Sequence, residues 1–126
     1  MVYPGRMADT SHALSTSVLK ERLEAAFPSL LEELTQLVAI PSVSSDPAHA
    51  ADVERSAEHI RERFAALGLQ AKVLRETAAD GTEGKPALVA HTPQIEGAPT
   101  VLLYAHHDVQ PVGELDRWSM DPYKAE

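Results

Sequence analysis

Two imidazoles and a carboxylate lie next to one another at His106, His107 and Asp108. Side chains of an extended chain alternate between its two faces, so His106 and Asp108 are expected on one side and His107 on the other. A carboxylate beside a histidine can accept the ring N–H, which fixes the tautomer and strengthens the ring as a metal ligand. His106 is therefore a candidate metal ligand, and Asp108 a candidate catalytic residue that orients it. The alternative is an ordinary hydrogen-bonded pair at the end of a strand.

The elements that must position these groups begin with the apolar run Val101–Tyr104. A short continuous run rich in strand formers predicts a strand buried on both faces, starting at Thr100. Because Pro111 has no N–H to give to a sheet, the strand is expected to end near Asp108. Ionisable groups at the end of a buried strand are placed as in the active sites of open α/β sheets.

Upstream, the pattern predicts a helix that starts at Ser15, Thr16 or Ser17 and ends at Ile40–Pro41. Pro28 lies inside this pattern, and it either kinks the helix or opens a second one. The apolar positions that carry the helical spacing are Leu23, Phe27, Leu30, Leu34 and Leu37.

A second helix is predicted from Ala48 to Leu67, with Gly68 as its left-handed cap. Residues 69–76 and 86–92 then read as strands that pair back on each other across a turn. The predicted fold class is α/β, two helices followed by three strands. Residues 1–14 are expected to form a flexible N-terminus.

Composition narrows the classes of partner. The 126 residues suffice for one domain with a core, and 11 basic against 19 acidic residues give a net charge of −8. An acidic chain without a basic block argues against nucleic acid or an anionic membrane as partner. The absence of cysteine excludes disulfide scaffolds and thiolate metal sites, and it suits the cytoplasmic location that we expect. No apolar stretch is as long as a membrane span, and the N-terminal residues have no apolar core of the signal-peptide type. No Gly-rich phosphate loop follows a predicted strand, which disfavours a nucleotide-binding domain.

Four motifs occur in one order: IPSVS, GKPALVAHT, VLLYAHHDVQPV and W-x-x-D-P-Y. Together, over roughly residues 30–123, they resemble the metal-dependent exopeptidase family. That family includes cytosolic dipeptidases, carnosinase-like enzymes, aminoacylase, carboxypeptidase G, acetylornithine deacetylase and succinyl-diaminopimelate desuccinylase. The Val-Gln-Pro that follows Asp108 looks more like the dipeptidase branch than the deacetylase branch.

The resemblance implies the N-terminal part of a zinc-exopeptidase sandwich of the phosphorylase/hydrolase-like type. It implies that His106 ligates one of two zinc ions, with cobalt or manganese as other metals, and that Asp108 orients His106. His107 falls at the variable middle position and is expected to pack or face solvent. A structural role is implied for Trp118, Asp121, Pro122 and Tyr123, and none of the other histidines (His12, His49, His59, His91) matches a family position.

The resemblance also implies a function. Family members hydrolyse an amide bond, here in dipeptides or short peptides, and use a bridging aspartate, a Glu-Glu pair and a lid domain that have no counterpart before Glu126. We therefore expect residues 15–126 to be the N-terminal part of a catalytic domain, inactive alone, whose full-length enzyme is compatible with a homodimer. Two alternatives stay open: a deacylase of N-acyl amino acids, and a non-catalytic truncated α/β module.

Overall fold

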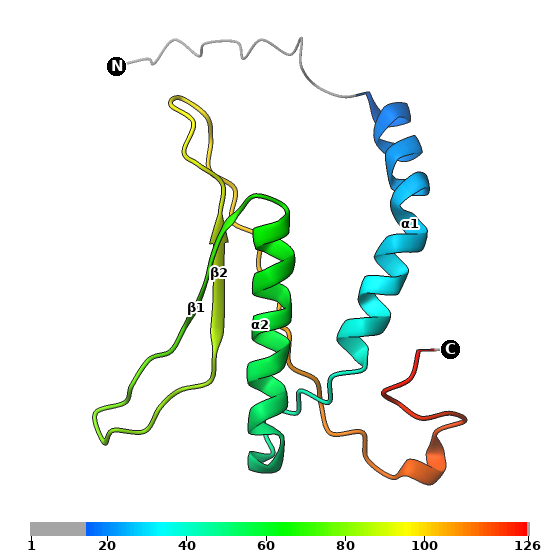
Figure 1. Cartoon of the computed structure of the whole chain (residues 1–126), viewed down its shortest axis with the longest axis vertical. Coiled ribbons are helices and arrows are strands. Elements are labelled where there is room, and N and C mark those ends of the chain that lie inside the picture. The colour runs from blue at the N-terminus through cyan, green and yellow to red at the C-terminus, as the bar shows by residue number, and fades with distance from the viewer. Residues whose placement is uncertain (1–14, 126) are drawn as a thin grey trace, which may run out of the picture. The chain divides into compact units, whose positions relative to one another are not determined.

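The computed structural model describes residues 15–125, which contain two α-helices and one β-hairpin (Figure 1). The chain divides into two units that meet between Glu33 and Leu34, and each is described by itself. The flexible N-terminus predicted for residues 1–14 lies outside the described residues. Neither α-helix in this part of the chain is long and apolar enough to cross a membrane.

Helix α1 (Thr16–Val38) is one continuous helix with Pro28 inside it, so no second helix opens at Pro28. Ser15 is its N-terminal cap: the Ser15 carbonyl accepts from the Leu19 N–H at 3.0 Å, and its hydroxyl accepts from the Val18 N–H at 3.4 Å. The helix ends just before Pro41, as predicted, because the residue before a proline disfavours the helical region.

Helix α2 (Ala50–Ala66) follows a short 3-10 turn, η2 (Pro47–His49), and confirms the second predicted helix. Asp46 caps the turn, since its Oδ1 accepts from the Ala48 N–H at 2.9 Å. At the other end Gly68 has a φ of 81°, the left-handed conformation that closes a helix at little cost only for glycine.

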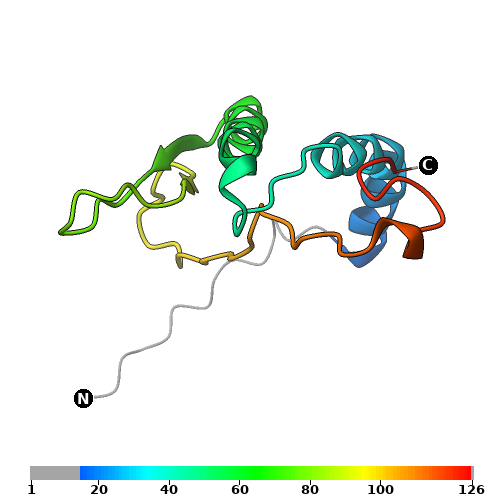
Figure 2. The same ribbon diagram turned by 90° about the horizontal axis from the view of Figure 1, so that it is seen from below.

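Strands β1 (Gln70–Leu74) and β2 (Ala87–His91) form the predicted antiparallel hairpin, and α2 lies against it (Figures 1 and 2). The register pairs Ala71 with Ala90 and Val73 with Leu88, and these four side chains are the half-buried ones. Alternate residues point to the same face of a strand, so this is the face that α2 covers. Among the described residues, buried side chains lie on α2 and on the segment after α1: Ile40, Ser42, Val43, Val53, Ser56 and Ala57.

The α/β class is confirmed, but the third strand predicted for residues 100–108 is wrong for the described part of the chain, whose sheet has two strands. Val101 is 75% exposed, and Leu102, Leu103 and Tyr104 are about nine-tenths exposed, so the run is not buried either. A strand requires a neighbour that accepts its ladder hydrogen bonds, and β-propensity alone does not supply one. The segment pairs only further along, where Val109 forms a single parallel bridge with Val43.

The substitution Val53→Ala tests this core. Val53 is 2% exposed on α2, and truncation should lower the free energy of unfolding by about 2 kcal/mol through lost burial and a residual cavity. Val89→Ala is the matched control, because Val89 is 50% exposed on the uncovered hairpin face. Urea unfolding of both variants measures the difference, and equal losses would contradict the assignment of the buried face.

Candidate metal-ligand site

His106 and Asp108 lie together, as their spacing predicted. The His106 Nδ1 is 3.1 Å from Asp108 Oδ1 and 2.9 Å from the main-chain carbonyl oxygen of Asp108. Both oxygens are acceptors, so Nδ1 carries the proton that they accept. In the neutral imidazole the lone pair is then on Nε2. The His106 side chain is 74% exposed. The ring therefore presents an accessible Nε2 of the tautomer that a metal ligand requires.

The second carboxylate oxygen of Asp108 also has a partner. The Ser44 hydroxyl donates to Asp108 Oδ2 at 2.5 Å, from the loop between α1 and η2. This hydrogen bond is the main reason that the pKa of Asp108 is lowered, with a further contribution from the hydrogen bond to His106 against a cost of burial. Asp108 is thus an ionised carboxylate at neutral pH, which is the form that holds an imidazole N–H most strongly.

His107 turns away from the pair, as the alternation predicted, and it packs rather than facing solvent. Its ring is half-buried between α2 and the start of β2. Nε2 lies 3.2 Å from the carbonyl oxygen of Pro86, and Nδ1 lies 3.2 Å from the Ser56 hydroxyl. Because a carbonyl can only accept, Nε2 must donate to Pro86.

The main chain of His107 is held as firmly as its ring. Its carbonyl oxygen accepts two hydrogen bonds, from the hydroxyls of Ser42 and Ser56, each at 3.0 Å. Those serines are 1% and 0% exposed, so their hydroxyls require protein partners. Two residues further along the chain, the Val109 N–H donates to the Ser42 carbonyl at 3.1 Å. Side-chain hydrogen bonds from two elements thus replace the ladder of the predicted strand.

These serines are what the sequence reasoning missed. Ser56 lies three residues after Val53 and four before Ile60, so it falls on the apolar stripe of its helix. A polar residue on such a stripe needs a buried partner, and that signal was available. The partner itself could not be identified, because it is a main-chain carbonyl 51 residues away.

Two of the remaining histidines, His49 and His91, have partners close to them in sequence. The His49 Nδ1 lies 2.8 Å from Asp52 Oδ2, and the other carboxylate oxygen of Asp52 pairs with Arg55 at 2.8 Å. The exposed His91 ring lies 3.1 Å from the carbonyl of the next residue. His59 is half-exposed on α2, and His12 lies outside the described residues.

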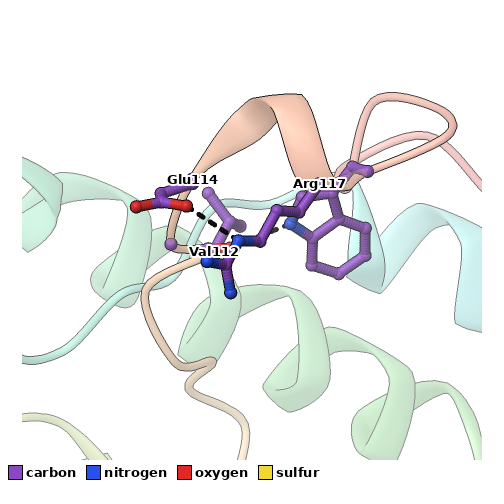
Figure 3. Close-up of a pocket in the computed structure, with 5 residues that line it drawn as sticks. Val112, Glu114 and Arg117 are labelled. Atoms are coloured by element: carbon purple, nitrogen blue, oxygen red, sulfur yellow. Dashed lines mark hydrogen bonds and ion pairs between the residues drawn. The ribbon is translucent and has the colours of Figure 1, made fainter.

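The segment after the site forms a loop with its own contacts (Figure 3). Trp118 Nε1 donates to the Val112 carbonyl at 2.8 Å, and an exposed ion pair joins Arg117 to Glu114 at 2.7 Å. These three side chains, with Val112 and Gly113, line a hollow that includes neither His106 nor Asp108. Asp121 stabilises the following turn by accepting from the Tyr123 N–H at 3.0 Å. These contacts support the structural role expected for the Trp…Asp-Pro-Tyr motif.

The donor chemistry fits one ligand of a metal site and not a whole site. Within residues 15–125, no three side chains of the His, Cys, Asp and Glu types come together in a way that could hold a metal ion. A catalytic zinc ordinarily takes three protein ligands and a water. The exposed imidazole of His106 is one candidate ligand, and within residues 15–125 no two further side chains of these types join it.

Comparison with known proteins identifies relatives of this chain. No family model matches the sequence. The Cys-Gly metallodipeptidase DUG1 of Candida albicans is 32% identical over 90% of this chain and 25% of its own length. The cysteinylglycine-S-conjugate dipeptidase of Corynebacterium striatum is 31% identical over 74% of this chain and 19% of its own. The chain therefore spans about a quarter or less of these relatives.

A solved structure agrees with the sequence matches. The dipeptidase Dug1p of Saccharomyces cerevisiae superposes on 82% of this chain and 23% of its own, with a TM-score of 0.73 and 26% identity. The chain is thus homologous to part of a metallopeptidase, which confirms the resemblance of its motifs. Within that class these relatives are dipeptidases, the branch that the Val-Gln-Pro sequence indicated.

His107→Ala tests whether the middle histidine holds the segment. Its loss leaves the carbonyl of the buried Pro86 without the imidazole donor, and the free energy of unfolding should fall by about 1–3 kcal/mol. His107→Phe restores the volume of the ring without its hydrogen bonds and should recover only part of the loss. His91→Ala, at an exposed ring, is the control and should change stability little. Thermal or urea unfolding measures all three, and equal effects at positions 107 and 91 would contradict the packing role.

Proposed function

We propose that this chain is part of a metal-dependent dipeptidase that hydrolyses the amide bond of dipeptides or short peptides. The observation that carries the proposal is the arrangement of His106 with its Nδ1 hydrogen-bonded to Asp108 and its Nε2 exposed. The names of the relatives support the substrate class, and cysteinylglycine is the first dipeptide to test. The matched region is about a quarter of the length of those proteins, so the dipeptidase activity of the whole protein is proposed here.

In this proposal His106 is one metal ligand, through Nε2, and Asp108 keeps its ring in the ligating tautomer. The metal is proposed to be zinc, with cobalt and manganese as the alternatives that an imidazole ligand also suits. A metal of this kind, when bound, polarises the scissile carbonyl and lowers the pKa of a water. The chain's own contribution is to hold the ligand: Ser42, Ser56 and His107 fix the main chain that carries it.

Two other functions remain alternatives. A deacylase of N-acyl amino acids would cleave the same kind of bond, and the relatives' names favour the dipeptidase. A non-catalytic α/β module is favoured by one observation, namely that no group of three metal-ligating side chains occurs within residues 15–125. A small peptide substrate, a homodimeric full-length enzyme and a cytoplasmic location are parts of the same proposal.

Chelation tests the proposal directly. Hydrolysis of cysteinylglycine by the protein expressed from its full gene should fall at least about 100-fold with a chelator, and zinc or manganese should restore it. His106→Ala should cause a comparable loss together with lower metal content, measured by elemental analysis. The control is His91→Ala, because the exposed ring of His91 lies against the carbonyl of the next residue, away from the His106–Asp108 pair in sequence. Full activity after chelation or in His106→Ala would refute the proposal.

Zinc titration of the 126-residue chain separates the alternatives. One accessible imidazole should bind Zn²⁺ only weakly and support no hydrolysis, because a catalytic zinc needs further ligands. Tight stoichiometric binding with peptidase activity would contradict the expectation that this chain is inactive alone. Faster cleavage of acetylornithine than of cysteinylglycine by the protein from the full gene would favour the deacylase.

A further inference from the structure

We propose that Ser44 is a positioning residue of this site: its hydroxyl holds the Asp108 carboxylate in the orientation that keeps Nε2 of His106 available to a metal. The inference rests on the proposed function in that His106 is taken as the ligand. The hydrogen bond of the Ser44 side chain goes to Asp108, and Ser44 acts through that carboxylate.

Each oxygen of the Asp108 carboxylate accepts a hydrogen bond. Oδ2 accepts from Ser44 at 2.5 Å, and Oδ1 accepts from His106 Nδ1 at 3.1 Å. Rotation of an aspartate carboxylate about its last torsion is soft, so a single hydrogen bond to His106 would define the plane of the group poorly. The bond from Ser44 removes that freedom. It matters here because Asp108 is 33% exposed, and water would otherwise compete for its oxygens.

The position of Ser44 is itself determined by the main chain. Val43, the preceding residue, is 3% exposed and forms the parallel bridge with Val109, the residue that follows Asp108. Ser44 follows Val43 directly at the start of a turn, and Asp108 directly precedes Val109, so the bridge brings the two residues close together. The hydroxyl therefore reaches the carboxylate without the ordering of a long side chain, and Ser44 needs only one χ1 rotamer to make the bond.

A purely structural role of Ser44 would have a different consequence for the His106 ring. If Ser44 only tied the loop after α1 to the segment at Asp108, its removal would lower stability and leave the histidine unchanged. A positioning role predicts an effect on the His106 ring itself, and imidazole ¹⁵N shifts report the tautomer of that ring without any metal or activity. Metal affinity then measures the consequence for the site.

The test compares Ser44→Ala with Ser44→Thr, which keeps the hydroxyl, and with Ser45→Ala at the exposed neighbouring serine. In Ser44→Ala the fraction of His106 with the proton on Nδ1 should fall, but it should stay above that of a free imidazole because the main-chain carbonyl of Asp108 still accepts from Nδ1. The dissociation constant for Zn²⁺ should rise about 10-fold, the lower end of the effect of removing groups that orient metal ligands. Ser44→Thr should restore both quantities to near the unmodified values, and Ser45→Ala should change neither. Ser44→Cys, which fills the same space with a weak donor, serves if the alanine variant does not fold, and it should shift both quantities in the same direction.

The outcomes separate this inference from the proposed function. An unchanged His106 tautomer and an unchanged Zn²⁺ dissociation constant in folded Ser44→Ala or Ser44→Cys would overturn the role of Ser44, even if the protein is a metal-dependent dipeptidase. A shifted tautomer that Ser44→Thr restores would support Ser44, even if cysteinylglycine hydrolysis proves insensitive to chelation and the proposed function fails.

Discussion

The carbonyl oxygen of His107 is the point on which the candidate site depends. Two buried hydroxyls, one from the segment after α1 and one from α2, donate to this single acceptor. The residues around it have no strand ladder, so these bonds and the bridge at Val109 supply what a sheet ordinarily supplies. An unpaired buried hydroxyl costs more than a typical hydrogen bond contributes, and the three groups therefore stabilise one another in one arrangement.

Alternation of the extended chain divides the tasks among three adjacent residues. His107 directs its ring inward to Pro86 and Ser56, while His106 and Asp108 project outward as a pair. The inward residue anchors the main chain, and the outward residues carry the ligand chemistry. Burial follows the same division, because the His106 side chain is 74% exposed whereas the ring of His107 is half-buried. An accessible lone pair is thus obtained at a place where the backbone is held firmly.

Local rules predicted the elements whose causes are local. The stop before Pro41 and the left-handed Gly68 each depend on a few neighbouring residues, and the structure confirms them. A cap at Ser15, Thr16 or Ser17 was predicted on the same local grounds, and the structure has it at Ser15. The His106–Asp108 contact was also predictable, because two residues of spacing determine it. The contacts of Ser42, Ser44 and Ser56 were not. Each joins residues more than 50 positions apart, and nothing in the local sequence identifies such a partner.

The wrong prediction of a third strand has the same physical origin. Val101, Leu102 and Leu103 have strong preferences for a pleated, buried surface, yet in the described residues they are 75–90% exposed. Preference becomes a strand only when a neighbour accepts the ladder bonds and covers the side chains. The site at His106 is ordered without such a neighbouring strand, because serine hydroxyls, and not the apolar run, bind the main chain of His107 and the carboxylate of Asp108. The His106–Asp108 pair and the apolar run are adjacent in sequence, but their conformations depend on different contacts. The pair depends on serine hydrogen bonds, whereas a strand at the apolar run would depend on a neighbouring strand.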